Sequence, residues 1–223
     1  MNIFLLAAFV FAMLEVLALW KNSPRLEYIT KPAVMIALFL WLWTSVGLNG
    51  ALLWFGLGIL LSLAGDVLLM ISLDRFFLAG LVAFLFAHVA YVIGFNTPFP
   101  NLSAWGFILA FMIGISSIRI IRRIVDPLHS KGQAGLRIPI LIYALVISLM
   151  LLSAMLKLTD TSWQAGAALL VALGAFLFYL SDILLAWMKF VAPIHNGRIY
   201  NILAYHLGQI ALIVGVVMQF KLN

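Results

Sequence analysis

The sequence predicts an all-α integral membrane protein: eight transmembrane helices in one bundle, with residues 1–223 forming a single transmembrane domain. Composition and spacing carry this prediction. Hydrophobic residues make up 66% of the chain and charged residues 9%, whereas a soluble domain carries about 25% charged residues. The mean hydropathy is +1.19. Eight apolar stretches each approach the roughly 20 residues that a helix needs to cross the hydrocarbon core, and 223 residues leave no room for a separate soluble domain.

The first four stretches are bounded by residues that break helices. The N-terminal stretch lacks the basic region and small-residue cleavage site of a signal peptide, so we expect it to remain as the first span. The breakers are Asn22-Ser23-Pro24, Asn49-Gly50 and Asp74-Arg75. Only Asn49-Gly50 separates the second span from the third. The predicted spans are 2–20, 32–49, 51–72 and 76–96.

The last four stretches are separated in the same way. The breakers are Thr97-Pro98-Phe99-Pro100, a basic loop at 122–137, Thr159-Asp160, and Pro193 with Asn196-Gly197. The predicted spans are 102–120, 138–156, 163–187 and 199–219. Pro32 and Pro139 fall at or near helix starts, where proline is tolerated, so no span is expected to contain proline in its interior.

The basic residues test this arrangement. Eight spans place all but Lys157 and Lys221 on one side of the membrane, where the 119–137 loop is the largest feature and a topology anchor. Lys and Arg mark cytoplasmic loops. We therefore predict a protein of the cell (inner) membrane with both termini outside, and read the net charge of +6 as topology, with no nucleic-acid partner. The eleven residues on the basic side are Lys21, Arg25, Lys31, Arg75, Arg119, Arg122, Arg123, Lys131, Arg137, Lys189 and Arg198.

Several kinds of chemistry lack their residues. The chain has no cysteine, which excludes disulfides, thiolate nucleophiles and Cys-ligated metals. It contains no G-x-S-x-G nucleophile elbow and no H-E-x-x-H zinc motif. It also has no Walker A or Rossmann glycine pattern.

Two matching motifs place a carboxylate inside an apolar span. They are AGDVLLM (64–70) and LSDILLA (180–186). Asp66 lies six residues before the predicted cytoplasmic end of its span and Asp182 five, so each is roughly 8–9 Å below that end. His88 and His206 follow in the next spans, 22 and 24 residues later. The spacing suggests a four-plus-four parallel repeat.

Further polar residues are expected near these carboxylates. A charged side chain in the membrane costs at least about 2.5–3.5 kcal/mol, so it should face the bundle interior. Glu15 shares the depth of the two aspartates, and Lys31 sits at the cytoplasmic mouth of the second span. His88 lies past the midplane, where we expect only a hydrogen bond linking helices. Tyr143, Tyr179, Tyr205 and Gln209 lie in the same half or near the midplane.

Paired carboxylates in a water-poor cleft favour acid–base chemistry. Both cannot ionise cheaply, so one is expected to keep its proton while the other ionises, helped by Lys31. This suits hydrolysis of an acid-labile bond in a lipid, given the depth of the site. Two alternatives remain open: a zinc site, with His88, His206, Asp66 and Asp182 as ligands, and proton-coupled transport. The depth of His88 argues against the first alternative, and spans without interior proline argue against the second.

Several motifs together resemble the YhhN-like lysoplasmalogenase family over nearly the whole chain. They are TKP (30–32), AGDVLLM, FAHVAYV (86–92), LSDILLA after Phe178-Tyr179, and YHLGQ (205–209), where the family has Ala in place of Gly208. The resemblance implies hydrolysis of the vinyl ether bond of lysoplasmalogens, giving a fatty aldehyde and glycerophosphoethanolamine or glycerophosphocholine. Its alternatives are a zinc-dependent intramembrane lipid hydrolase of the ceramidase kind and a transporter.

The resemblance also implies roles for particular residues. Asp66 and Asp182 would be the catalytic acid and the ionised carboxylate, in either order, and Lys31 would contact the headgroup phosphate. Glu15 would hold Lys31 or join the acid pair. No cofactor or metal is implied, and the partners are a lysophospholipid substrate and the lipid bilayer. The residues expected to position the substrate are Tyr143, Tyr179, Tyr205, His206 and Gln209.

Overall fold

The computed structural model describes residues 2–98 and 104–221, and within them every regular element is helical. Eight helices are long and apolar enough to cross a membrane, which confirms the predicted fold class. Short 3₁₀ helices precede α6 and α7, at Ala134–Leu136 and Lys157–Thr159. The helices are α1 (Ile3–Trp20), α2 (Pro24–Val46), α3 (Ala51–Ile71), α4 (Phe77–Phe95), α5 (Ala104–Ser130), α6 (Arg137–Leu156), α7 (Ala165–Phe190) and α8 (Gly197–Lys221).

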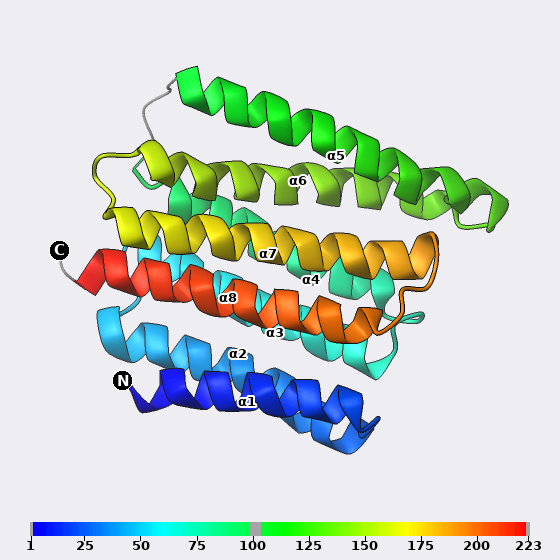
Figure 1. Ribbon diagram of the computed structural model, residues 1–223, viewed down its shortest axis with the longest axis horizontal. Coiled ribbons are helices and arrows are strands. Elements are labelled where there is room, and N and C mark those ends of the chain that lie inside the picture. Colours follow the sequence, from blue (N-terminus) through cyan, green and yellow to red (C-terminus); the bar gives the residue numbers. More distant parts are fainter. Residues whose placement is uncertain (1, 99–103, 222–223) are drawn as a thin grey trace.

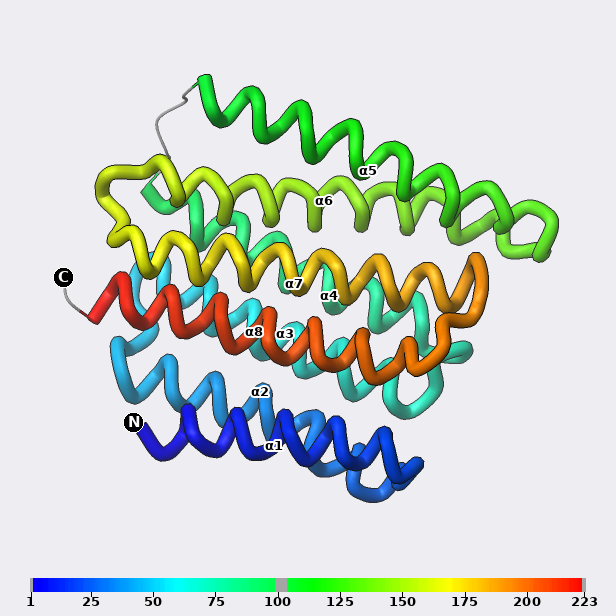
Figure 2. The backbone as a smooth tube through the Cα atoms, in the orientation of Figure 1, coloured from blue at the N-terminus to red at the C-terminus, as the bar shows by residue number. Residues whose placement is uncertain are grey.

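The helices lie side by side along one common direction (Figure 1). An even number of spans brings both termini to the same end of the bundle, as the backbone trace shows (Figure 2). The α7–α8 pair lies in front of α3 and α4, and α5 forms one edge. Few residues of α5 are buried, namely Ser117, Ile124, Val125 and Leu128. The core therefore lies among the other helices, and α5 covers it from one side.

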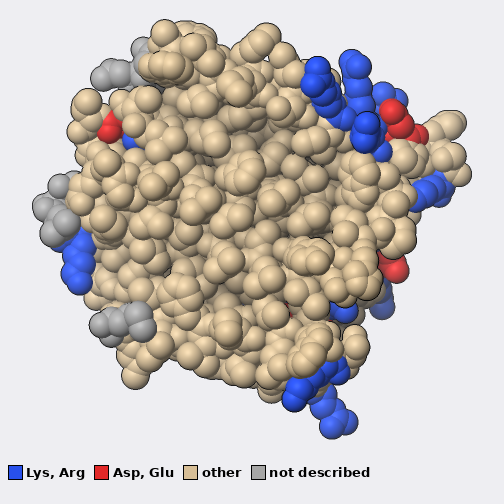
Figure 3. Space-filling model, in the orientation of Figure 1, with Lys and Arg blue, Asp and Glu red and all other residues tan. Residues whose placement is uncertain are grey.

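Charge is concentrated at the end of the bundle opposite the termini. Most Lys and Arg side chains on the visible face gather there, beside the α1–α2, α5–α6 and α7–α8 connections (Figure 3). The apolar surface between the two ends is nearly free of charge in this view. This is the distribution that the predicted spans require, and we refer to this end as the basic end.

The predicted start of the second span was wrong. The structure begins α2 at Pro24, directly after Ser23, because proline suits the first turn of a helix, where its missing N–H costs nothing. Pro32 therefore lies inside α2 and not at its start. The expectation that no span contains an interior proline is also wrong, so it no longer argues against transport.

The predicted 119–137 loop is mostly helix. Helix α5 continues to Ser130, ten residues beyond the predicted end at 120. The extension is amphipathic: Ile124 and Leu128 are buried, whereas Arg122 and Arg123 are exposed. Such a helix stays folded beyond the hydrocarbon core because one face packs on the protein while the other meets water. The predicted start of this span at 102, and part of the breaker at 97–100, lie outside the described residues.

Small residues set the separation of α7 and α8. A Cβ atom added at Gly208 would lie 2.8 Å from the backbone N of Phe178 and 2.9 Å from the carbonyl oxygen of Gly174. Real Cβ atoms are not found that close to backbone atoms, so the two helices touch through their main chains here. Small residues at helix interfaces allow this approach in membrane proteins.

We expect Gly208→Ala to destabilise the protein by about 1–3 kcal/mol, because the new methyl group forces α7 and α8 apart. Thermal unfolding in detergent measures the effect. The matched control is Gly114→Ala on α5, where a Cβ meets nothing within 4 Å. The control should be neutral or slightly stabilising, since alanine is the better helix former. Equal midpoints for the two variants would contradict this account of the interface.

A buried ion pair anchors the connection between α6 and α7. Lys157, expected from the sequence to be a loop charge, is only 3% exposed, and its Nζ lies 3.0 Å from Oδ2 of Asp160. The backbone N and the hydroxyl of Ser162 donate to Oδ1 at 3.0 and 2.6 Å. Burial alone would raise the pKa of Asp160, but the hydrogen bonds from Ser162 and Lys157 outweigh it and lower that pKa below its usual value of 3.8.

Asp160→Asn should therefore lower the stability at pH 7 by about 1–2 kcal/mol, since it leaves a buried ammonium without its partner. A carboxylate whose pKa is lower in the folded state than in the unfolded state stabilises the protein at a pH above the unfolded-state pKa. This stabilisation is lost as the pH falls through the folded-state pKa. The stability gap between wild type and variant should therefore narrow as pH falls below about 4, where the unfolded carboxylate takes up a proton, and it should close below the lowered pKa of the folded carboxylate. Thermal unfolding across pH 3–7 tests this, and a gap that does not change with pH would contradict it.

Candidate active site

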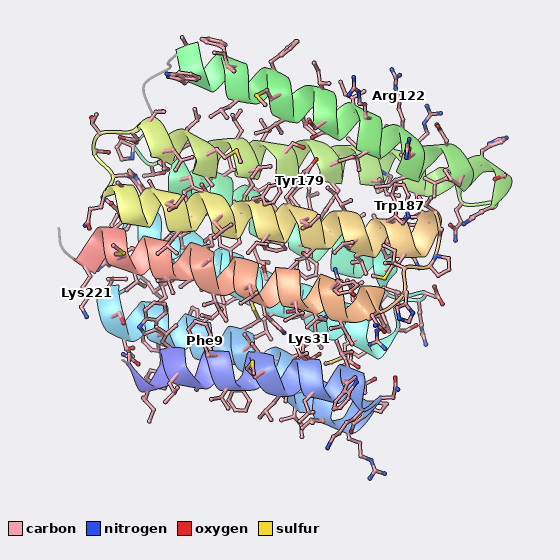
Figure 4. The ribbon with its side chains drawn as sticks, in the orientation of Figure 1. Phe9, Lys31, Arg122, Tyr179, Trp187 and Lys221 are labelled. Carbon is pink, nitrogen blue, oxygen red and sulfur yellow. The ribbon has the colours of Figure 1, made fainter. Side chains whose placement is uncertain are left out.

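A cavity of about 650 Å³ at the basic end is lined by both intramembrane aspartates. Its walls come mainly from α2, α3, α7 and α8. Asp66 lies five residues before the end of α3 and Asp182 eight before the end of α7, which is about 7.5 and 12 Å of helix. Lys31 also lines the cavity, where α2 passes α8 (Figure 4). The two acids predicted to converge thus open onto one shared space.

Asp66 is held by two groups from other helices. Its Oδ1 lies 3.2 Å from Nζ of Lys31 on α2, and the hydroxyl of Tyr205 on α8 donates to its Oδ2 at 2.6 Å. The residue is 1% exposed. Gly65 precedes it because any side chain there would run into the ring of Phe84 on α4. Asp66 is therefore a buried carboxylate with a fixed orientation and an ammonium partner.

A buried polar layer lies behind Asp66. The amide of Gln209 donates to the hydroxyl of Ser62 at 3.1 Å, and its oxygen accepts from Tyr91 at 2.8 Å. All three side chains are buried, and none lines the cavity. The structure therefore places Gln209, predicted to position substrate, one helical turn away from Tyr205 and behind the cavity wall.

Asp182 is held differently. The hydroxyl of Tyr143 on α6 donates to its Oδ2 at 2.5 Å, and Nε2 of His88 on α4 lies 3.2 Å from the same oxygen. Nε2 of His88 is also 3.0 Å from the Tyr143 hydroxyl, so the three groups form a closed triangle. The Asp182 side chain is 15% exposed, toward a cavity that also contains Asp66. Among the described residues, the basic side chain beside Asp182 is a histidine and not a lysine or an arginine.

The helix-linking hydrogen bond expected of His88 is confirmed, because its Nε2 contacts Tyr143 on α6 and Asp182 on α7, but the assumed difference in depth between His88 and Asp182 was wrong. Helix α7 runs to Phe190 and not 187, so Asp182 lies deeper than predicted, and His88 lies eleven residues into α4 from Phe77. Side-chain length bridges the remaining difference. The near-equal spacing of Asp66 to His88 and of Asp182 to His206 marks the two histidines as equivalent, but it does not pair His88 with Asp182.

The helices that supply partners to the two aspartates can be compared with the predicted repeat. Asp66 is bound from α2 by Lys31 and from α8 by Tyr205. Asp182 is bound from α6 by Tyr143 and from α4 by His88. In a four-plus-four repeat α2 matches α6, and α8 matches α4. This is the arrangement such a repeat would give, and the repeat itself remains a prediction.

The other predicted residues lie nearby but do not all reach the cavity. The hydroxyl of Tyr179 hydrogen-bonds that of Ser117 on α5 at 2.8 Å, and its side chain lines a second, apolar pocket together with Asp182. Glu15 accepts a hydrogen bond from Thr30. Lys31 pairs with Asp66, so the alternative in which Glu15 holds Lys31 is not what the structure shows.

His206 lies apart from both carboxylates. It is buried with its ring 5.2 Å from that of Tyr205, and neither ring nitrogen has a hydrogen-bond partner among the described residues. It does not line the cavity. Its predicted contact with substrate therefore lacks support in the geometry.

The four candidate metal ligands are not gathered into one site. His88 and Asp182 are adjacent, whereas Asp66 pairs with Lys31 and Tyr205. Across residues 2–98 and 104–221, no group of three or more His, Asp or Glu side chains is arranged to hold a metal ion. The tetrahedral ligand set considered from the sequence is thus not formed.

Charged residues surround the mouth of the cavity. Lys189 and Arg198 line it, together with Glu27. Arg198 pairs with Glu27 at 2.7 Å, and Lys189 pairs with Asp74 at 2.9 Å. A ligand in this cavity would therefore meet both cations and anions at the basic end and a pair of carboxylates deeper inside.

Comparison with known proteins identifies one family and two relatives. A model of the YhhN family matches residues 26–216. The mouse protein "Lysoplasmalogenase TMEM86B" is 25% identical over 226 aligned residues, which cover 94% of this chain and 84% of the mouse protein. The human protein of the same name is 24% identical over 219, covering 93% and 84%. No solved structure matches this chain.

Proposed function

The chain belongs to the YhhN family, and on that premise we propose that it hydrolyses the vinyl ether bond of lysoplasmalogens, releasing a fatty aldehyde and glycerophosphoethanolamine or glycerophosphocholine. One observation carries the proposal: two carboxylates with unlike partners line a single cavity among membrane-spanning helices. The names of the mouse and human relatives support the same reaction.

The chemistry of a vinyl ether explains why two carboxyl groups suffice. Hydrolysis begins with transfer of a proton to the β-carbon, which leaves an oxocarbenium ion at the carbon bound to oxygen. Water adds to that carbon, and the resulting hemiacetal breaks down to an aldehyde and an alcohol. The overall change consumes one water, with no oxidant or reductant. The protein must supply an acid, an anion beside the cation, and a base for water.

We assign the acid to Asp182. It has no lysine or arginine partner in the part of the chain that the structure describes, and Tyr143 and His88 both contact Oδ2, so Oδ1 is the oxygen left to carry a proton. Neutral His88 with its proton on Nε2 donates within this triangle and holds the carboxyl in place. The acid would deliver its proton to the β-carbon of a substrate in the cavity.

We assign the ionised carboxylate to Asp66. Its ion pair with Lys31 and the hydrogen bond from Tyr205 fix its negative charge at the cavity wall. From there it stabilises the oxocarbenium ion and takes a proton from the attacking water. When the hemiacetal collapses, Asp66 gives the proton it took from water to the leaving alcohol oxygen, and the hemiacetal hydroxyl gives its proton to Asp182. Both carboxyl groups thus return to their starting states.

The charged mouth fits a phospholipid headgroup. We place the phosphate between Lys31 and Arg198, which both line the cavity, and the substrate ammonium beside Glu27. Tyr143, Tyr179 and Tyr205 would position the substrate near the acids. Glu15, His206 and Gln209, which lie behind the lining, would support these residues rather than touch the lipid.

Arg198→Gln should raise KM about fivefold, since an exposed charge-assisted hydrogen bond contributes roughly 1 kcal/mol. Because the residue is 69% exposed, the effect should shrink as salt increases. Steady-state kinetics at low and high ionic strength measure both quantities. A change confined to kcat would contradict a headgroup role.

The decisive experiment compares two lipids. Purified protein is incubated with a lysoplasmalogen and with its saturated alkyl ether analogue, and the fatty product (aldehyde or alcohol) and the released glycerophospho compound are both assayed. Only the vinyl ether should react, because a saturated ether has no carbon that accepts the proton. Turnover of both lipids, or of neither, would overturn the proposal.

Isotopes test the route. In D₂O the aldehyde should carry one deuterium on the carbon next to its carbonyl, detectable after immediate reduction to the alcohol. In H₂¹⁸O the released glycerophospho compound should contain no ¹⁸O, because water attacks the alkenyl carbon. Label in that product would point to attack at the glycerol carbon and would exclude the oxocarbenium route.

We also propose that the basic end faces the cytoplasm and both termini lie outside, following the distribution of Lys and Arg. The chain contains no cysteine, so single cysteines are unambiguous probes. Lys221→Cys should react with an impermeant maleimide on intact cells, whereas Lys131→Cys should react only after permeabilisation. The reverse pattern would invert the orientation.

A further inference from the structure

An apolar pocket adjoins the cavity at Asp182. Its walls come mainly from α4, α5, α6 and α7, and it shares Leu69, Phe84, Asp182 and Leu185 with the cavity. Tyr179 and Asp182, three residues apart on α7, both line this pocket. Asp182 therefore lies at the boundary between the charged cavity and the apolar pocket.

The pocket offers almost no polar partner to a ligand. Among the described residues that line it, the hydroxyls of Tyr143 and Tyr179 are the only polar side-chain groups apart from Asp182, and both are already engaged, with Asp182 and Ser117. The remaining lining side chains are aliphatic or aromatic hydrocarbon, among them Ile121 and Ile147. An apolar group is the ligand that such a surface stabilises.

We infer that this pocket binds the first carbons of the alkenyl chain of a single-chain glycerophospholipid, which sets the vinyl ether against Asp182 while the headgroup occupies the charged cavity. The inference rests on the proposed function. A single-chain amphiphile fits across the boundary between the cavity and the apolar pocket. Its polar part can contact Lys31 and Arg198 in the cavity, and its apolar part can fill the apolar pocket.

Size limits how much of the chain enters. The pocket volume of about 70 Å³ takes roughly two or three groups of water or methylene size, at about 30 Å³ each. Its outer wall includes Ile120, Ile121 and Ile124 of α5, the helix at the edge of the bundle. The rest of the chain would continue past α5 toward the bilayer. The pocket thus orients the bond to be cleaved without measuring the full length of the chain.

Ile121→Trp tests the pocket kinetically. The larger ring fills space next to the chain, so kcat/KM for a long-chain lysoplasmalogen should fall at least tenfold more than kcat/KM for the two-carbon vinyl ether of the same headgroup. The matched control is Ile118→Trp, on the same helix but 53% exposed and outside the pocket lining. The control should keep the wild-type ratio of long to short substrate. An unchanged ratio in Ile121→Trp, or an equal change in both variants, would overturn the inference.

Photolabelling tests it without catalysis. The probe is a saturated alkyl ether lysophospholipid with a diazirine on the fourth chain carbon, which the proposed reaction does not cleave. Labelled peptides should come from the α5 and α6 segments that line the pocket, and Ile121→Trp should reduce the label while Ile118→Trp does not. Pocket labelling by a protein that releases no aldehyde would reject the proposed function and keep the lipid pocket. Aldehyde release together with label spread over the lipid-facing helices would reject the lipid pocket and keep the proposed function.

Discussion

Asp182→Asn is expected to lower kcat for lysoplasmalogen by about 10²–10⁴-fold, the usual contribution of a general acid. The amide oxygen can still accept from Tyr143, so the geometry around His88 is retained, but an amide cannot deliver a proton to carbon. Aldehyde release by the purified variant measures the effect, and KM should change little because shape and volume are kept.

Two controls make this result specific. The variant should show the same elution and a similar unfolding temperature as wild type, since no buried charge loses its partner. Asp182→Glu, which keeps the acid but moves it, should retain more activity than Asp182→Asn. Wild-type turnover by Asp182→Asn would remove this residue from the reaction and leave the acid unassigned.

Asp66→Asn should abolish turnover to a similar extent and also destabilise the protein. The side chain of Lys31 is 12% exposed, so the substitution leaves a largely buried ammonium unpaired. Breaking a buried pair from one side costs about 3–5 kcal/mol, whereas replacing both partners by neutral groups is often nearly neutral. Loss of activity in the single variant alone would therefore not separate catalysis from folding.

The double variant Lys31→Met with Asp66→Asn separates them. It should recover most of the stability lost in Asp66→Asn, because no unpaired charge remains. It should not recover turnover, because the anion beside the oxocarbenium ion is still missing. Thermal unfolding and aldehyde release on the same preparations give both values. Activity restored together with stability would show that Asp66 only holds the fold.

The two aspartates differ in their partners and in their exposure, and this difference is the central feature of the site. Asp66 has an ammonium within 3.2 Å and is almost fully buried, whereas Asp182 has a phenol and an imidazole and is partly open to the cavity. Unlike surroundings drive two carboxyl groups toward unlike protonation states, which is how one fold presents an acid and a base together. The family resemblance alone does not say which residue is which.

The predicted span ends were wrong at α5 and at α2, for two different reasons. Hydropathy detects residues that lie in hydrocarbon, but a helix also continues into water when one of its faces has something to pack against. Helix α5 extends to Ser130 because Ile124 and Leu128 pack on the protein while its arginines face solvent. Helix α2 starts at Pro24 for a local reason, because proline favours the first turn.

The sequence by itself determined the eight spans, the charged end and the two acids. These follow from one-dimensional quantities: the length of apolar runs, the distribution of Lys and Arg, and the free-energy cost of placing a carboxylate in a membrane. It could not determine the partners of those acids. Tyr205 reaches Asp66 across 139 residues of sequence and His88 reaches Asp182 across 94. Those contacts depend on how closely the helices pack, and only the three-dimensional arrangement of the bundle decides that.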